Sequence, residues 1–108
     1  MPKGIMVVQS APSDPAREDE FNEWYSHAHL PEILAVPGFV SARRYKVHDP
    51  GNGVPPAHTY LAVYEIEADD LTGPAKELRA RSAAGETTSS DALQTDPPPV
   101  ITFYELFE

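Results

Sequence analysis

Residues 21–32 read FNEWYSHAHLPE, and VPGF follows at residues 36–39. Within the first stretch, apolar side chains recur at the i, i+3, i+4 and i+7 spacing that places them on one face of a helix. That face consists of Phe21, Trp24, Tyr25 and Ala28. Asp14 and Pro15 precede it and suit the N-cap and the first helical position. The pattern therefore predicts a helix that starts near Asp14 and buries an aromatic stripe.

Two histidines, His27 and His29, end this predicted helix just before Pro31, which we expect to break it, with a short helical turn around Glu32–Ala35 before the tight turn at Pro37-Gly38. At about 100° per residue, His29 lies about 40° from Tyr25, on the edge of the aromatic stripe, and His27 lies on the other side. We therefore expect His29 to reach into a cleft between helix and sheet, where its near-neutral pKa suits proton transfer. The structural alternative is a histidine that only packs there or caps the helix end.

The other elements are indicated by apolar runs and turn-forming residues. Strands are predicted at Ile5–Val8, Phe39–Val47, Thr59–Ile66 and Val100–Phe107, and a second helix at Leu71–Ala83. Asp49–Pro56 is a loop between two hairpin strands, and Gly85–Pro99 is either a plain connector or a lid. The order β-α-β-β-α-β predicts an α+β, ferredoxin-like fold, with a four-stranded antiparallel sheet and both helices on one face.

The strands carry large apolar or aromatic residues at both odd and even positions, as in VITFYELF at residues 100–107. A sheet covered on one side only would alternate more cleanly. A chain of 108 residues, which we take as one domain spanning residues 1–108, also leaves much of its surface exposed. We therefore expect a homodimer in which a second copy covers the free face of the sheet.

The composition restricts the partners. The formal net charge is −9 and the longest basic run is Arg43-Arg44, so nucleic acid and anionic membranes are not expected to bind. The chain has no cysteine, which excludes disulfides, thiolate metal sites and cysteine nucleophiles and fits a cytoplasmic location. The apolar run at residues 5–8 is too short for a signal peptide or a membrane span. We expect a small organic molecule as the ligand.

Two arginines and two tyrosines on the predicted strands are further site candidates. Arg43 and Arg44 point to opposite faces of their strand. One of them can therefore enter the cleft as a clamp for an anion or enolate, while the other is solvated. Tyr60 and Tyr64 share a face and either line the pocket or pack in the core.

Metal and nucleotide sites are not expected. His27 and His29 lie two residues apart and diverge on a helix, and the nearby Glu32 follows a proline. The stretch Gly51-Asn52-Gly53 lies between strands instead of ahead of a helix, so it does not form a phosphate loop. A serine elbow of the hydrolase type is also lacking in the sequence. We therefore predict a protein without a metal or another cofactor.

The string W-Y-x-x-x-H-L-P-E at residues 24–32, with V-P-G-F at residues 36–39 and an Arg/Tyr-bearing strand after it, resembles the dimeric α+β barrel superfamily. It is most similar to the EthD-like (ethyl tert-butyl ether degradation protein-like) members. The resemblance implies two ferredoxin-like subunits packed sheet to sheet, each with a cleft between its sheet and its helices. It also implies that His29 matches the family's recurring histidine. Relatives include cofactor-independent polyketide cyclases, lactone isomerases and oxygenases, and proteins that degrade haem.

These residues and the resemblance together predict a cofactor-independent cyclase, isomerase or lyase that acts on a polyketide-like, lactone or aromatic substrate. His29 would transfer the proton, and Tyr25 with Arg43 would stabilise an oxyanion. The remaining candidates would bind the substrate: Trp24, Arg44, Tyr60 and Tyr64. One alternative is a non-catalytic ligand-binding or accessory protein. Another is a cofactor-free or haem-dependent oxygenase, in which histidine is the only plausible haem ligand because cysteine is absent.

Overall fold

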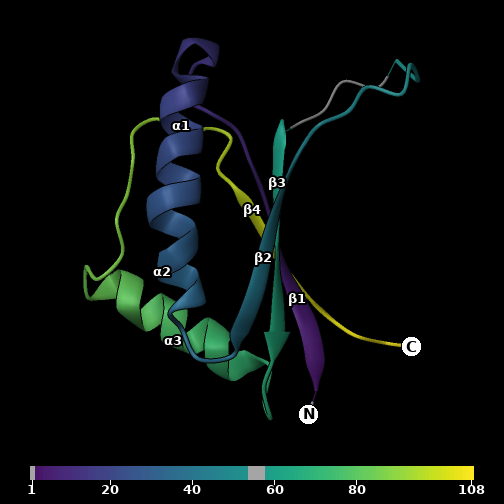
Figure 1. The fold of residues 1–108 in the computed structure, drawn as a ribbon, viewed down its shortest axis with the longest axis vertical. Coiled ribbons are helices and arrows are strands. Elements are labelled where there is room, and N and C mark those ends of the chain that lie inside the picture. Colours follow the sequence, from purple (N-terminus) through teal and green to yellow (C-terminus); the bar gives the residue numbers. More distant parts are fainter. Residues whose placement is uncertain (1, 54–57) are drawn as a thin grey trace.

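The computed structural model describes residues 2–53 and 58–108, so residues 54–56 of the predicted loop lie outside the described residues. The four strands form one antiparallel sheet in the order β2-β3-β1-β4. Their bounds are β1 Lys3–Ser10, β2 Phe39–Lys46, β3 Tyr60–Glu67 and β4 Val100–Glu105. The helices α1 (Glu18–Trp24), α2 (Leu30–Leu34) and α3 (Thr72–Ala83) lie on one side of this sheet (Figure 1). The predicted ferredoxin-like α+β fold is thereby confirmed.

The core lies between the sheet and the α1–α2 side of the helical layer. Strand β3 alternates strictly, so that every second side chain from Tyr60 to Ile66 is buried toward the helices. Its neighbour β1 presents Met6 and Val8 to the same side, because the antiparallel register pairs Met6 with Tyr64 and Val8 with Ala62. The period of two along each strand therefore produces one continuous apolar layer.

The first helical segment begins as the sequence predicts. Asp14 is an N-cap whose carboxylate accepts a hydrogen bond of 2.8 Å from the backbone N–H of Ala16. Pro15 opens a 3₁₀ turn at Pro15–Arg17, and α1 follows with acidic residues in its first turn, where the helix dipole favours negative charge.

The helix does not break at Pro31, which corrects the prediction. Between Tyr25 and His29 the backbone forms a π-helical turn, in which the N–H of Leu30 donates to the carbonyl of Tyr25. This wider turn accommodates Pro31, which has no N–H to donate and whose ring would clash with a carbonyl of a regular α-helix. The chain therefore continues directly into α2, and His29 lies within a continuous helical segment instead of at its end.

The tight turn that follows α2 packs closely against α3. Gly38 has a φ of 103°, a left-handed conformation that favours glycine. A Cβ atom at this position would collide with the ring of Pro74 in the first turn of α3. The predicted helix Leu71–Ala83 is confirmed apart from its first residue, since α3 starts at Thr72 and Pro74 does not delay it.

The segment between α3 and β4 packs against the molecule along much of its length and runs beside α1 in Figure 1. Ala92 in this segment is fully buried, and its carbonyl accepts a hydrogen bond of 2.6 Å from the backbone N–H of Ser13. The N–H of Gln94 donates to the carbonyl of Ala11, and Leu93 forms an isolated bridge with Pro12. The predicted loop Gly85–Pro99 is thus partly core and more than a surface connector. Among the described residues, no helix is long and apolar enough to cross a membrane.

Candidate functional site

A cavity of about 530 Å³ lies between the sheet and the helices, on the side where α3 faces β1 and β4. The sheet contributes Met6, Val8 and Ser10 from β1 and Ile101 and Phe103 from β4. The first helical segment contributes Trp24, Tyr25, His29 and Ile33, and α3 contributes Ala75, Leu78, Arg79 and Ser82. Leu93 and Pro99 from the last loop complete the lining. Three of the sequence-predicted residues therefore share one cleft, and they are His29, Tyr25 and Trp24.

The imidazole of His29 is held between two aromatic rings. It stacks on Trp24 with ring centroids 4.8 Å apart and an interplanar angle of 21°, and it meets Tyr25 edge to face at 5.0 Å. Its Nδ1 atom is buried and has no hydrogen-bond partner among the described residues. Burial lowers the pKa of His29, and the negative charge of Glu32 opposes that shift only in part. The imidazole is therefore neutral at pH 7 and can accept a proton.

The hydroxyl of Tyr25 belongs to a buried pair. The hydroxyl of Tyr64 donates to it over 3.3 Å, which leaves the proton of Tyr25 able to donate in turn. Burial raises the pKa of both phenols, so both are neutral at physiological pH. Tyr64 lies beneath Tyr25 in the core, with an exposed fraction of 0%, and is not part of the cleft lining. A neutral phenol beside a neutral imidazole provides one hydrogen-bond donor and one proton acceptor.

A hydrogen-bonded chain orients Trp24 and, through it, His29. The indole Nε1 of Trp24 donates to Oγ1 of Thr88 over 3.1 Å. Thr88 in turn donates through its hydroxyl (2.8 Å) and its backbone N–H (2.7 Å) to the carboxylate of Glu32. The loop between α3 and β4 is thereby attached to α2 close to the cleft. Thr88 was not predictable from the sequence, since only tertiary structure brings it to Glu32 and Trp24, which lie 56 and 64 positions away.

The two strand arginines lie on opposite faces of β2, as predicted, and neither lines the cleft. Arg44 is on the helix side, where its guanidinium donates to Oγ of Ser26 and Oδ1 of Asn22, each over 2.9 Å. It also lies over the ring of Tyr25, 4.4 Å from the centroid. Arg43 pairs with Val63 on the other side of the sheet and is exposed. Arg44 therefore connects the first helical segment to the sheet.

The remaining candidates lie apart from the cleft. Tyr60 packs on Phe21 at a centroid distance of 5.3 Å, and its hydroxyl donates to Glu18 over 2.6 Å. His27 is exposed, with its Nε2 atom 3.6 Å from a carboxylate oxygen of Glu23. Within residues 2–53 and 58–108, no group of three or more histidine, aspartate or glutamate side chains is arranged to hold a metal ion.

The second wall of the cleft, formed by α3, was not among the sequence predictions. Ala75, Leu78, Arg79 and Ser82 follow the i, i+3, i+4, i+7 spacing and therefore share one face of α3. That spacing was the available signal, but the face mixes apolar, polar and charged residues and does not form an apolar stripe. The opposite wall was easier to detect because its members are aromatic.

Comparison with solved structures agrees with the topology described above. An EthD family protein from Bacillus halodurans C-125 superposes with a TM-score of 0.65 at 16% identity, over 99% of this chain and 100% of that chain. A proposed monooxygenase from Shewanella loihica PV-4 gives 0.60 at 19% identity, over 100% and 98% of the two chains. This chain has an EthD-like fold. An EthD-like protein from Ralstonia eutropha JMP134 gives a TM-score of 0.58 at 14% identity, over 95% and 90%.

These comparisons cover 95–100% of this chain, which confirms the resemblance inferred from residues 24–39. No protein-family model matches the sequence, and no curated protein sequence matches it. The roles of individual residues in this EthD-like chain therefore rest on the geometry of its own cleft.

Proposed function

We propose that this protein is a small-molecule enzyme of the cofactor-independent cyclase, isomerase or lyase type, in which His29 transfers a proton. The observation that carries the proposal is the Nδ1 atom of His29, which is buried beside an apolar cleft without a partner among the described residues. A buried polar atom left unpaired costs about 1–3 kcal/mol, so such an atom is a strong candidate for a functional group.

The reaction follows from the neutral state of the two side chains. The imidazole of His29 takes a proton from a carbon next to a carbonyl of the substrate, and the electrons of that C–H bond move onto the carbonyl oxygen. The hydroxyl of Tyr25 donates a hydrogen bond to the oxyanion that forms. The imidazolium then returns the proton to another atom of the intermediate, which completes an isomerisation.

The first test is deuterium exchange at the acidic C–H positions of 2-tetralone, an apolar ketone, followed by NMR in D₂O. Loss of a positioned general base typically costs about 10²–10⁴ in rate, so His29→Ala should slow the protein-catalysed exchange by that factor. His27→Ala is the matched control, because His27 is exposed and outside the cleft. Thermal melts of both variants establish that they fold. Equal losses from the two substitutions, or exchange no faster than in buffer, would contradict the proposal.

Oxygenation is the second candidate, since the Shewanella loihica neighbour is described as a proposed monooxygenase and has the same fold. The same base would first deprotonate the substrate, and the carbanion would then react with dioxygen. An oxygen electrode distinguishes the two, because proton transfer alone consumes no oxygen. Ligand binding without either reaction would instead support an accessory role.

We also propose a homodimer formed through the sheet face that points away from the helices. On that face the register pairs Val7 of β1 with Val63 of β3, while Ile5 lies opposite Glu65 and Leu61 lies opposite Gln9. Tyr104 extends it on β4, with an exposed fraction of 56%. A face with this apolar centre suits an obligate interface, which buries on the order of 2,000 Å² or more.

The dimer is tested by replacing Val63, near the middle of this face, with aspartate. Multi-angle light scattering should report twice the chain mass of 11.9 kDa for the wild type and a shift toward the monomer for Val63→Asp. An exposed control on the other side of the molecule, Lys76→Asp, should leave the mass unchanged. A wild type that is monomeric at micromolar concentration would contradict the proposal.

A further inference from the structure

Helix α3 presents one charged side chain to the cleft. Of its four lining residues, Ala75 and Leu78 are apolar, Ser82 is neutral, and Arg79 is a cation. The other charged residues of α3 do not line the cavity, and Arg81 is held by Glu77 over 3.0 Å. Arg79 is exposed, so water solvates its guanidinium, and from the edge of the cavity this cation can reach an anionic group of a ligand bound there.

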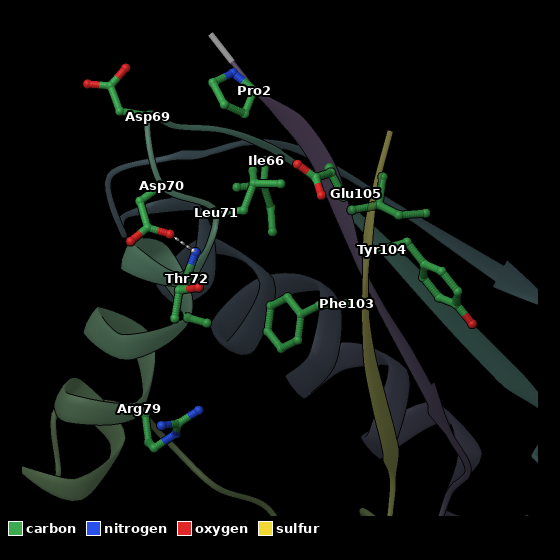
Figure 2. Close-up of a pocket in the computed structure, with 13 residues that line it drawn as sticks. Pro2, Ile66, Asp69, Asp70, Leu71, Thr72, Arg79, Phe103, Tyr104 and Glu105 are labelled. Carbon is green, nitrogen blue, oxygen red and sulfur yellow. Dashed lines mark hydrogen bonds between the residues drawn. The ribbon is translucent and has the colours of Figure 1, made fainter. Parts of the chain in front are cut away.

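Arg79 lies where two hollows meet. A second hollow of about 540 Å³ lies beside the cleft, near the start of α3 and the adjoining ends of β1 and β4. Ala75, Arg79 and Phe103 line both hollows, so the two adjoin at these residues. Figure 2 shows the guanidinium of Arg79 extending from α3 toward the side of the sheet that carries Phe103.

The far end of the second hollow is acidic. Asp69, Asp70 and Glu105 line it, and Figure 2 shows Asp69 and Asp70 at the opposite end from Arg79. The carboxylate of Asp70 already accepts a hydrogen bond from the N–H of Thr72 over 2.9 Å. Among the described residues, the guanidinium of Arg79 has no hydrogen bond and no ion pair with these acids or with any other group. An anionic ligand is therefore attracted to Arg79 and repelled from the region beyond it.

We infer that the cleft takes a hydrophobic organic acid, whose carboxylate pairs with Arg79 and whose carbon body fills the apolar space toward His29. The planar guanidinium matches a carboxylate with two parallel hydrogen bonds. On a protein of net charge −9, this local cation also selects the anionic end of the ligand and so sets its direction in the cleft. The inference rests on the proposed function, because it names the class of substrate for the same site.

The test compares 2-naphthoate with its neutral analogue 2-naphthalenemethanol by isothermal titration calorimetry. The wild type should bind naphthoate about tenfold more tightly than the alcohol, since a hydrogen bond to a charged group contributes about that factor. Arg79→Met should weaken naphthoate by the same factor and leave the alcohol unchanged, and Arg79→Lys should restore part of the difference. Lys76→Met is the matched control, because it removes one positive charge from the same helix outside both hollows.

Two kinds of result would overturn the inference, and they have different consequences for the proposed function. Equal affinity for the two probes, or equal effects of Arg79→Met and Lys76→Met, would refute the role of Arg79 while leaving the His29 cleft in place. Binding of neither probe, or binding unaffected when Leu78 is replaced by the bulkier Trp to fill the cavity, would refute the cleft itself as the ligand site. Deuterium exchange with the wild type and His29→Ala tests independently whether the cleft is the site of the reaction.

Discussion

The two helical walls of the cleft are built in different ways. The segment that comprises α1, the π-helical turn and α2 presses Phe21, Tyr25 and Ile33 into the core, and each of them is at most 2% exposed. In α3, which the structure describes in full, Pro74 is the buried residue. The first wall therefore stabilises the fold, and the second leaves space for a ligand. His29, the proposed base, belongs to the first wall and lines the cleft together with residues of the second.

The contrast between the two walls would be wrong if both contributed equally to the free energy of unfolding. Phe21→Ala removes a fully buried ring, for which a loss of about 3–5 kcal/mol in the free energy of unfolding is expected. Leu78→Ala on α3 should cost less than about 2 kcal/mol, because Leu78 is only partly buried at the cleft. Urea unfolding of both variants measures the two losses. Similar values would show that α3 belongs to the core as much as α1 does.

Two arginines, one at each wall, allow a second test of the same contrast, with smaller expected losses of stability. Arg44 connects the first wall to the sheet through Ser26, Asn22 and the ring of Tyr25, so Arg44→Met should lower the free energy of unfolding by about 1.5–3 kcal/mol. Arg81 on α3 pairs with Glu77 and donates a hydrogen bond of 3.3 Å to the carbonyl of Ala35, so Arg81→Met should cost less, about 0.5–1.5 kcal/mol. Chemical denaturation of the two variants tests the difference. A larger loss from Arg81→Met would reverse the assignment of the walls.

The smallest expected effect is a pH dependence confined to the first wall. Because burial lowers the pKa of His29, the unfolded chain binds a proton at this residue while the folded chain still does not. The contribution of His29 to stability is thus complete above its unfolded pKa of about 6.5 and is lost as the pH falls through its lower folded pKa. The stability difference between the wild type and His29→Gln should therefore shift against the wild type between pH 7.5 and pH 5. A difference that is constant over this range would contradict the burial of His29.

Much of the fold was predictable because its signals are local. The N-cap at Asp14, the aromatic spacing from Phe21 to Tyr25 and the alternation in β3 each depend on a few neighbouring residues. The same local spacing placed Trp24, Tyr25 and His29 on one side of the helix, and the structure finds all three in the cleft lining. Their roles in a reaction remain predictions.

The parts that were not predictable depend on tertiary structure or on a change of helical period. The π-helical turn alters the 3.6-residue repeat, so Pro31 ended the predicted helix but not the real one. Spacing placed Arg43 and Arg44 on opposite faces of β2, yet only the packed helices show that neither lines the cleft. Arg79 went undetected because its helix face lacks an apolar pattern.

The stacking of Trp24 on His29 has a spectroscopic consequence. Trp24 is the single tryptophan of the chain, so all indole emission comes from the wall of the cleft. A protonated imidazole in contact with an indole quenches its fluorescence, whereas a neutral imidazole does so much less. The emission intensity should therefore follow the charge of His29, 4.8 Å away, as the pH is changed. The molecule thus carries an optical reporter of its own candidate base, which requires no label and no knowledge of the substrate.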